Sequence, residues 1–186
     1  MLSRTMVLAF HGCEARLAQE VAAGRSILQA GRNAYDWLGH GIYGWEDSPA
    51  RAWQWAKDAA AKGGIREPAV IGIVIDPGNC LNLIDTEALL LVKKGYAEYR
   101  RTCEASGMPE AKNRGSEFKA RFLDCAVFET LHATRMINKL PPFDTVRGFF
   151  VEGSELYPGA GLRDRDHIQI CVRNPKCIKG CFLPTN

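Results

Sequence analysis

The chain has 186 residues, of which 46% are hydrophobic and 24% are charged, and its formal net charge is +3. This composition is typical of a globular protein and excludes a fibrous or largely disordered one. The charge excess is too small to indicate a nucleic-acid-binding protein by itself, so RNA and DNA partners stay open. The length fits one domain over residues 1–186.

The N-terminal segment indicates neither export nor membrane insertion. Its apolar run Thr5–Phe10 soon meets His11, Glu14 and Arg16, which is unlike a signal peptide. The sequence lacks an apolar stretch of about 18 residues, the length needed to span a bilayer. We therefore expect a cytoplasmic protein without a membrane partner.

The seven cysteines form no CxxC pair, and their odd number is typical of reduced thiols. Cys171, Cys177 and Cys181 are close in sequence, but their spacing matches no known zinc finger and no nearby histidine completes a ligand set. Buried apolar cysteines are the alternative. We expect no metal.

The first predicted elements are a strand, a turn and a helix. Residues 5–10 form an apolar run that stops at His11-Gly12, as a buried strand ending in a turn would. A helix is expected over residues 14–23. Residues 31–46 contain many glycines and aromatic residues without a period, which predicts a loop that leads into a strand over 42–45.

The middle of the chain shows clear helix boundaries. Asp47-Ser48-Pro49 predicts an N-cap, and Gly63-Gly64 ends the helical segment 50–62. Residues 70–75 are a β-branched run and predict a buried strand. A second helix is expected over 83–105, with Asp85 or Thr86 near its start.

The last third begins with a predicted helix over 116–138, which we expect to be the longest of the chain. Three β-like runs follow, at 146–152, 167–173 and 178–183. This distribution predicts an α+β domain with a mostly antiparallel, split sheet. Neither a Rossmann nor a P-loop phosphate-binding motif occurs.

Three segments contain residues that could carry chemistry. His11-Gly12 offers a donor and an acceptor beside a backbone that a ligand can approach closely, although a lone histidine is more often structural. In segment 36–43, glycines surround aromatic rings that could stack on a planar ligand or could simply be core anchors. His167 and Gln169 share one face of a strand, where they either face solvent or reach into a cleft.

Taken together, these segments resemble the ADP-ribosyltransferase fold, in the branch of poly(ADP-ribose) polymerases and diphtheria-type toxins. The matching motifs are Phe10-His11-Gly12, Gly39-His40-Gly41-Ile42-Tyr43 and the helix start Ser48-Pro49-Ala50-Arg51-Ala52. The resemblance covers residues 8–56 in motif and the rest only in the order of elements. Within this fold the chain resembles small bacterial proteins, among which are toxins of toxin–antitoxin and phage-defence systems.

The resemblance implies NAD as co-substrate. It implies that His11 binds the nicotinamide-side ribose, that the Gly12 backbone holds the carboxamide, and that Tyr43 stacks on the nicotinamide ring, with Gly41 and Ile42 in the same binding segment. It further implies transfer of ADP-ribose to a protein or nucleic-acid acceptor with release of nicotinamide, and an antitoxin protein as partner.

The sequence departs from this family at the catalytic glutamate. Gln169 aligns with that position, and an amide can bind a ribose hydroxyl but brings no charge to stabilise an oxocarbenium-like state. Glu152 is the candidate replacement carboxylate, with Glu46 and Asp36 behind it. Two other functions therefore stay open: a non-catalytic NAD or ADP-ribose-binding module, and an interaction protein whose aromatic loop binds a partner.

Overall fold

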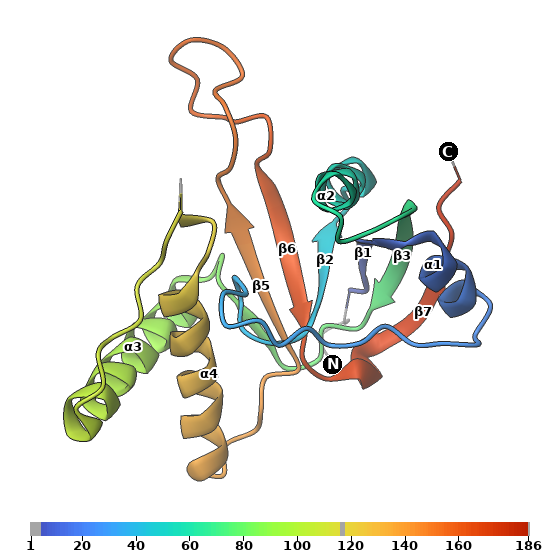
Figure 1. The fold of residues 1–186 in the computed structure, drawn as a ribbon. Helices are drawn as coiled ribbons and strands as arrows, with labels where there is room; N and C mark the ends of the chain where they lie inside the picture. The colour runs from blue at the N-terminus through green and yellow to red at the C-terminus, as the bar shows by residue number, and fades with distance from the viewer. Residues whose placement is uncertain (1–4, 116–117, 186) are drawn as a thin grey trace.

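The computed structural model describes residues 5–115 and 118–185, which fold around one hydrogen-bonded sheet (Figure 1). Its strands are β1 (Val7–Glu14), β2 (Ile42–Glu46), β3 (Pro68–Ile75), β4 (Cys80–Asn82), β5 (Thr145–Phe150), β6 (His167–Val172) and β7 (Ile178–Phe182). The seven strands lie in the order β4-β5-β6-β2-β1-β3-β7, and only the β4–β5 pair is parallel. The predicted α+β class is confirmed.

The helices of the described chain are α1 (Ala15–Ala22), α2 (Pro49–Ala61), α3 (Thr86–Ser106) and α4 (Phe122–Ile137), with a 3₁₀ turn η2 (Pro175–Cys177). The predicted bounds of α2 are confirmed: Pro49 is its first residue, and Gly63 follows its end with a φ of 77°. Asp85 is the N-cap of α3, and its carboxylate accepts the Glu87 N–H at 3.1 Å.

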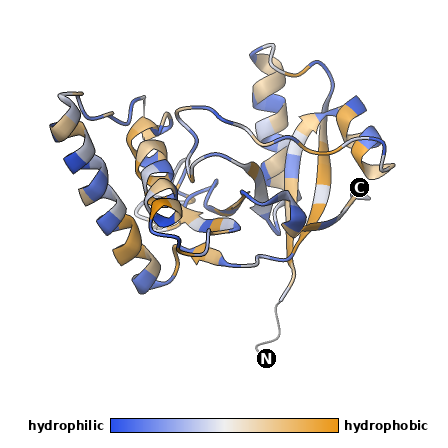
Figure 2. Cartoon of the chain, turned by 90° about the horizontal axis from the view of Figure 1, so that it is seen from below, coloured by the Kyte–Doolittle hydropathy of each residue, from blue (hydrophilic) through white to orange (hydrophobic). Residues whose placement is uncertain are grey.

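Helices cover both faces of the sheet. Because side chains alternate along a strand, Ala9 and Cys13 share one face, where they pack with Ile71 under α1. On the other face, Phe10 and Trp45 pack with Ala52 of α2 and Val70 of β3, and further along the sheet Cys171 and Phe150 pack with residues of α3 and α4. We call this second face the α2 face. Figure 2 shows the strands as mainly hydrophobic and the helices as mixed.

Strand β1 is longer than the sequence predicted. The expected turn at His11-Gly12 is wrong, because β1 continues to Glu14 and pairs with β3 as far as Glu14–Pro68. Only this long-range pairing extends the strand, so the local apolar run could not reveal it. The short strand β4 was also missed; it pairs with β5 from Cys80–Thr145 to Asn82–Arg147.

Helix α4 is shorter than predicted. It begins at Phe122, and α3, with 21 residues, is the longest helix among the described residues. Phe118 has a φ of 52° and Arg114 pairs with Ala120 in an isolated bridge, so α4 does not extend back over residues 118–121. The predicted start at Ser116 lies outside the described residues.

Strand β5 ends at Phe150, so Glu152 lies beyond the strand in which it was predicted. The chain then projects from the end of the sheet as a long loop before it returns into β6 (Figure 1). Among the described helices, none combines the length and the apolar composition that crossing a bilayer requires.

Candidate functional site

The two central strands β1 and β2 separate near the predicted NAD-binding motif. Their pairing comprises Ala9–Glu46 and Phe10–Trp45. The Leu8 carbonyl accepts the Asp47 N–H at 3.0 Å, and strand alternation then directs the N–H and C=O of Gly12 toward β2 as well. The structure thus places backbone polar groups of Gly12 at an opening between two strands.

His11 bridges this opening. Its Nδ1 lies 2.7 Å from the Tyr43 carbonyl oxygen, and because a carbonyl only accepts, Nδ1 carries the proton and donates. Burial lowers the pKa of His11 more than this hydrogen bond raises it. The neutral ring therefore keeps Nε2 as an acceptor.

Gly12 allows α2 to pack directly on the strand. A Cβ at Gly12 would lie 2.6 Å from the Ala52 carbonyl oxygen and 3.0 Å from Trp55. Gly12 and Tyr43 belong to the α2 face, whereas the His11 side chain belongs to the opposite face. The His11 and Tyr43 side chains therefore lie on opposite faces of the sheet, and the His11 ring contacts Tyr43 at its backbone carbonyl.

The Tyr43 side chain is held by the loop before β2. Its hydroxyl donates to the Gly39 carbonyl at 2.5 Å and accepts the Leu38 N–H at 2.8 Å. Burial raises the pKa of Tyr43, so the phenol stays protonated. The ring is half-buried and fixed in place, as a stacking surface would need to be.

The other two residues of the predicted binding segment have structural partners. Gly41 exchanges backbone hydrogen bonds with Gly31, at 2.9 and 3.1 Å, and a Cβ at Gly41 would collide with the Cys171 thiol. Ile42 is 2% exposed and packs in the core. Both residues position Tyr43.

The polar pair on β6 is buried. Gln169 pairs with Trp45 on one side and Gly148 on the other, and it shares the α2 face with His167. His167 is 5% and Gln169 8% exposed. The solvent-facing alternative is therefore wrong, and both side chains are covered on the α2 face.

Glu152 forms a buried ion pair that the sequence did not reveal. Its Oε2 lies 2.6 Å from Arg51 Nη2 in the first turn of α2, and both residues are 8% exposed. Lys119 Nζ lies 3.8 Å from Glu152 Oε1. The Arg51 guanidinium also lies over the Trp45 ring, 5.5 Å from its centroid. The carboxylate charge is thus largely compensated.

The two other candidate carboxylates lie elsewhere. Glu46 is bonded to Arg147, at 2.5 and 2.7 Å, on the face opposite Tyr43. Asp36 accepts from the backbone and the side chain of Asn33, at 3.0 and 3.2 Å, in the loop before β2. The structure brings neither of them to Gln169.

His167 completes a buried cluster with Arg51 and Glu152. Its Nδ1 lies 2.6 Å from the Arg165 carbonyl and 3.8 Å from Glu152 Oε2. Burial, together with the charge of Arg51, lowers the pKa of His167, against the opposing effects of the Arg165 bond and Glu152. Six buried side-chain atoms within residues 5–115 and 118–185 have no hydrogen-bond partner, and four of them belong to this cluster or to the Trp45 ring beside it: His167 Nε2, Arg51 Nε and Nη1, and Trp45 Nε1.

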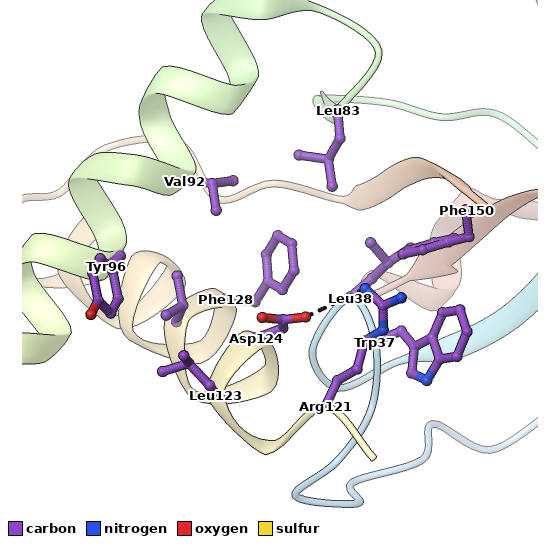
Figure 3. A pocket seen from close by; sticks show the side chains of 11 residues that line it. Trp37, Leu38, Leu83, Val92, Tyr96, Arg121, Leu123, Asp124, Phe128 and Phe150 are labelled. Carbon is purple, nitrogen blue, oxygen red and sulfur yellow. Dashed lines mark hydrogen bonds and ion pairs between the residues drawn. The ribbon is translucent and has the colours of Figure 1, made fainter. Parts of the chain in front are cut away.

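A pocket of about 350 Å³ lies beside this cluster, between α3, α4 and β5. Trp37 and Phe150 belong to its wall and also flank His167, with ring centroids 6.1 and 5.7 Å from the imidazole. Figure 3 shows the Arg121 guanidinium beside these two rings and its contact with Asp124. The pocket is mostly apolar with one charged end.

Sequence reasoning missed Arg51 and undervalued His167. Arg51 precedes Ala52 and lies five residues before Ala56, two small residues that pack against the sheet, so a position at the edge of the helix–sheet contact was readable. Its partner is 101 residues away, which no local pattern specifies. The chain matches no protein-family model, and no curated protein or solved structure is significantly similar to it.

Proposed function

We propose that the protein binds NAD at the opening between β1 and β2 and transfers its ADP-ribose to an acceptor, with release of nicotinamide. The observation that carries the proposal is the separation of these strands at Gly12, where His11 takes the place of a strand-pairing donor. In the split sheet of ADP-ribosyltransferases, which this opening would represent, the Gly12 amide and carbonyl suit a carboxamide, which needs one donor and one acceptor.

Groups on the two sides of the opening suit the rest of the nicotinamide riboside. His11 Nε2, on the face opposite Tyr43, is an acceptor for a ribose hydroxyl that enters the opening. The fixed Tyr43 ring offers a stacking surface for a cationic heteroaromatic ring, a contact that contributes about 0.5–2 kcal/mol. Gln169 lies on the same face and can orient the ribose through its amide.

Calorimetry with NAD tests binding, and release of nicotinamide from labelled NAD tests transfer. We expect Tyr43→Ala to weaken NAD binding about tenfold, by loss of stacking and of the loop contacts. Tyr157→Ala is the matched control, because Tyr157 is 63% exposed in the loop before β6. Absence of NAD binding by the wild-type protein would refute the proposal.

A non-catalytic NAD or ADP-ribose-binding module is the second candidate. It is favoured by the neutral amide of Gln169 and by the pairing of Glu152 with Arg51, which together leave little net negative charge to stabilise a cationic transition state. Binding of NAD without release of nicotinamide, in the presence of cell extract, would select this candidate.

The toxin role is tested by expression in bacteria. Transfer to an essential acceptor should make the wild-type chain poorly tolerated, whereas Tyr43→Ala should restore growth and Tyr157→Ala should not. Equal growth of all three strains at equal protein levels would exclude toxicity as the role and leave NAD binding to the calorimetric test.

A further inference from the structure

The proposed transfer lacks an obvious proton acceptor. When a hydroxyl attacks the ribose carbon, its proton must pass to a base, and an amide such as Gln169 cannot take it. Glu152 is held by Arg51 at 2.6 Å, and protonating this carboxylate would break a buried ion pair. A side chain on this face that can be neutral and basic is His167, two residues before Gln169 on β6.

The geometry of His167 is that of an oriented base. The Arg165 carbonyl, 2.6 Å away, fixes the proton on Nδ1, so the neutral ring presents its lone pair at Nε2. That Nε2 lacks a hydrogen-bond partner in the described part of the chain, and the residue is 5% exposed. A buried acceptor without a partner is costly, by about 1–3 kcal/mol, and a catalytic role is one of the explanations for it.

A nearby carboxylate would stabilise the His167 imidazolium once the ring has accepted a proton. Glu152 Oε2 lies 3.8 Å from Nδ1 and would interact with the imidazolium. The rings of Trp37 and Phe150 flank the imidazole and also line the 350 Å³ pocket, which provides room for an acceptor group. Since Nε2 is shielded from bulk solvent, contact is made by a group seated there or through one water.

We propose that His167 is the catalytic base of the transfer and that the acceptor is a hydroxyl group, water included. The acceptor oxygen forms a bond to the ribose carbon as the bond from that carbon to the nicotinamide nitrogen breaks. The electron pair of the broken bond stays on nicotinamide, which leaves neutral, and the hydroxyl proton passes to His167 Nε2. This inference rests on the proposed function.

The test compares water and azide as acceptors of ADP-ribose from NAD. Azide attacks as an anion and has no proton to lose, so it needs no base. We expect His167→Asn to slow nicotinamide release to water by about 10²- to 10⁴-fold, while NAD affinity is unchanged. Azide should restore release and yield ADP-ribosyl azide, which a variant with only a structural defect would not show.

His132→Asn is the matched control. His132 is also a buried histidine whose Nε2 lacks a partner among the described residues, but it lies on α4 against Phe143, away from Gln169. Its hydrolysis rate should equal that of the wild type. A His167→Asn variant that hydrolyses NAD at the wild-type rate, or that binds NAD but is not rescued by azide, overturns the proposal.

Two further measurements cover the other outcomes. If His167→Asn does not fold, His167→Gln is used, and the wild-type protein is compared in H₂O and D₂O: release to water should show a solvent isotope effect, and release to azide should not. Equal isotope effects overturn the role of a base. If the wild-type chain binds NAD but releases no nicotinamide, the proposed transfer is wrong. If the wild-type chain releases nicotinamide and the His167 variants release it at the same rate, the transfer stands and only the role of His167 is wrong.

Discussion

The buried ion pair between Arg51 and Glu152 gives the most direct test of the structure. Each residue is 8% exposed, and the contact of 2.6 Å joins α2 to the segment after β5. Replacing one partner by leucine leaves the other charge buried without compensation, at a cost of about 3–5 kcal/mol. For a chain of this size, that corresponds to a fall in Tm of roughly 6–20 °C.

The two single variants, Arg51→Leu and Glu152→Leu, should therefore each lower the urea midpoint strongly at an unchanged m value. The double variant should recover most of the loss, because replacing a buried ion pair by apolar residues is often neutral in stability. Glu20→Leu is the control, since its partner Arg16 is exposed and the expected change is below about 1 kcal/mol. Additive losses in the double variant would show that the two residues do not interact as described.

Three further perturbations follow from the site. Tyr43→Phe removes the partner of the Leu38 N–H and should cost about 1–3 kcal/mol in urea unfolding. Gly12→Ala places a methyl group 2.6 Å from the Ala52 carbonyl and should cost about 1–3 kcal/mol while weakening NAD binding. Burial lowers the pKa of His132 from 6.5 to about 4, so the unfolded chain binds the extra proton and roughly 3 kcal/mol of stability is lost as the pH falls from 6.5 to 4.

Each of these has a control and a refuting result. Tyr157→Phe should leave stability unchanged, because this residue is exposed. An equal loss in this control would show that the effect of Tyr43→Phe does not come from the hydrogen bonds of the Tyr43 hydroxyl. Gly180→Ala is the control for Gly12→Ala, because no atom lies within 4 Å of the added methyl group. This replacement of a strand glycine should leave stability unchanged. His132→Leu should flatten the pH dependence between pH 6.5 and 4, and an unaltered slope would assign that loss of stability to other groups.

The sequence predicted those elements whose end residues have strong backbone preferences of their own. Pro49 at the first helical position and Gly63 with its positive φ defined α2, and the β-branched run of β3 was confirmed with a two-residue extension to Pro68. These residues act through their own backbone preferences, so no distant partner is needed to interpret them.

Features that depend on distant partners were not predictable. The extension of β1 to Glu14 comes from pairing with β3, and β4 exists because Leu81 lies beside Val146 of β5. The start of α4 was missed because the positive φ of Phe118 has no local sequence signal. A histidine two residues from a glutamine on a strand looks the same in the sequence whether that face is covered or open, and only the distant segments that pack on the face decide between the two.

The charges around Glu152 favour one course of the proposed transfer over another. Loss of nicotinamide before attack would leave a cationic ribose, which benefits from a nearby uncompensated carboxylate. Here Glu152 is neutralised by Arg51, with Lys119 3.8 Å away, so little negative charge is available. In the proposed transfer, bond formation by the acceptor would then accompany the departure of nicotinamide, and the rate should rise with the nucleophilicity of the added acceptor. A release rate that is independent of the identity and concentration of the acceptor would instead indicate a free cationic intermediate. The Glu152 carboxylate would then have to separate from Arg51 to stabilise that cation.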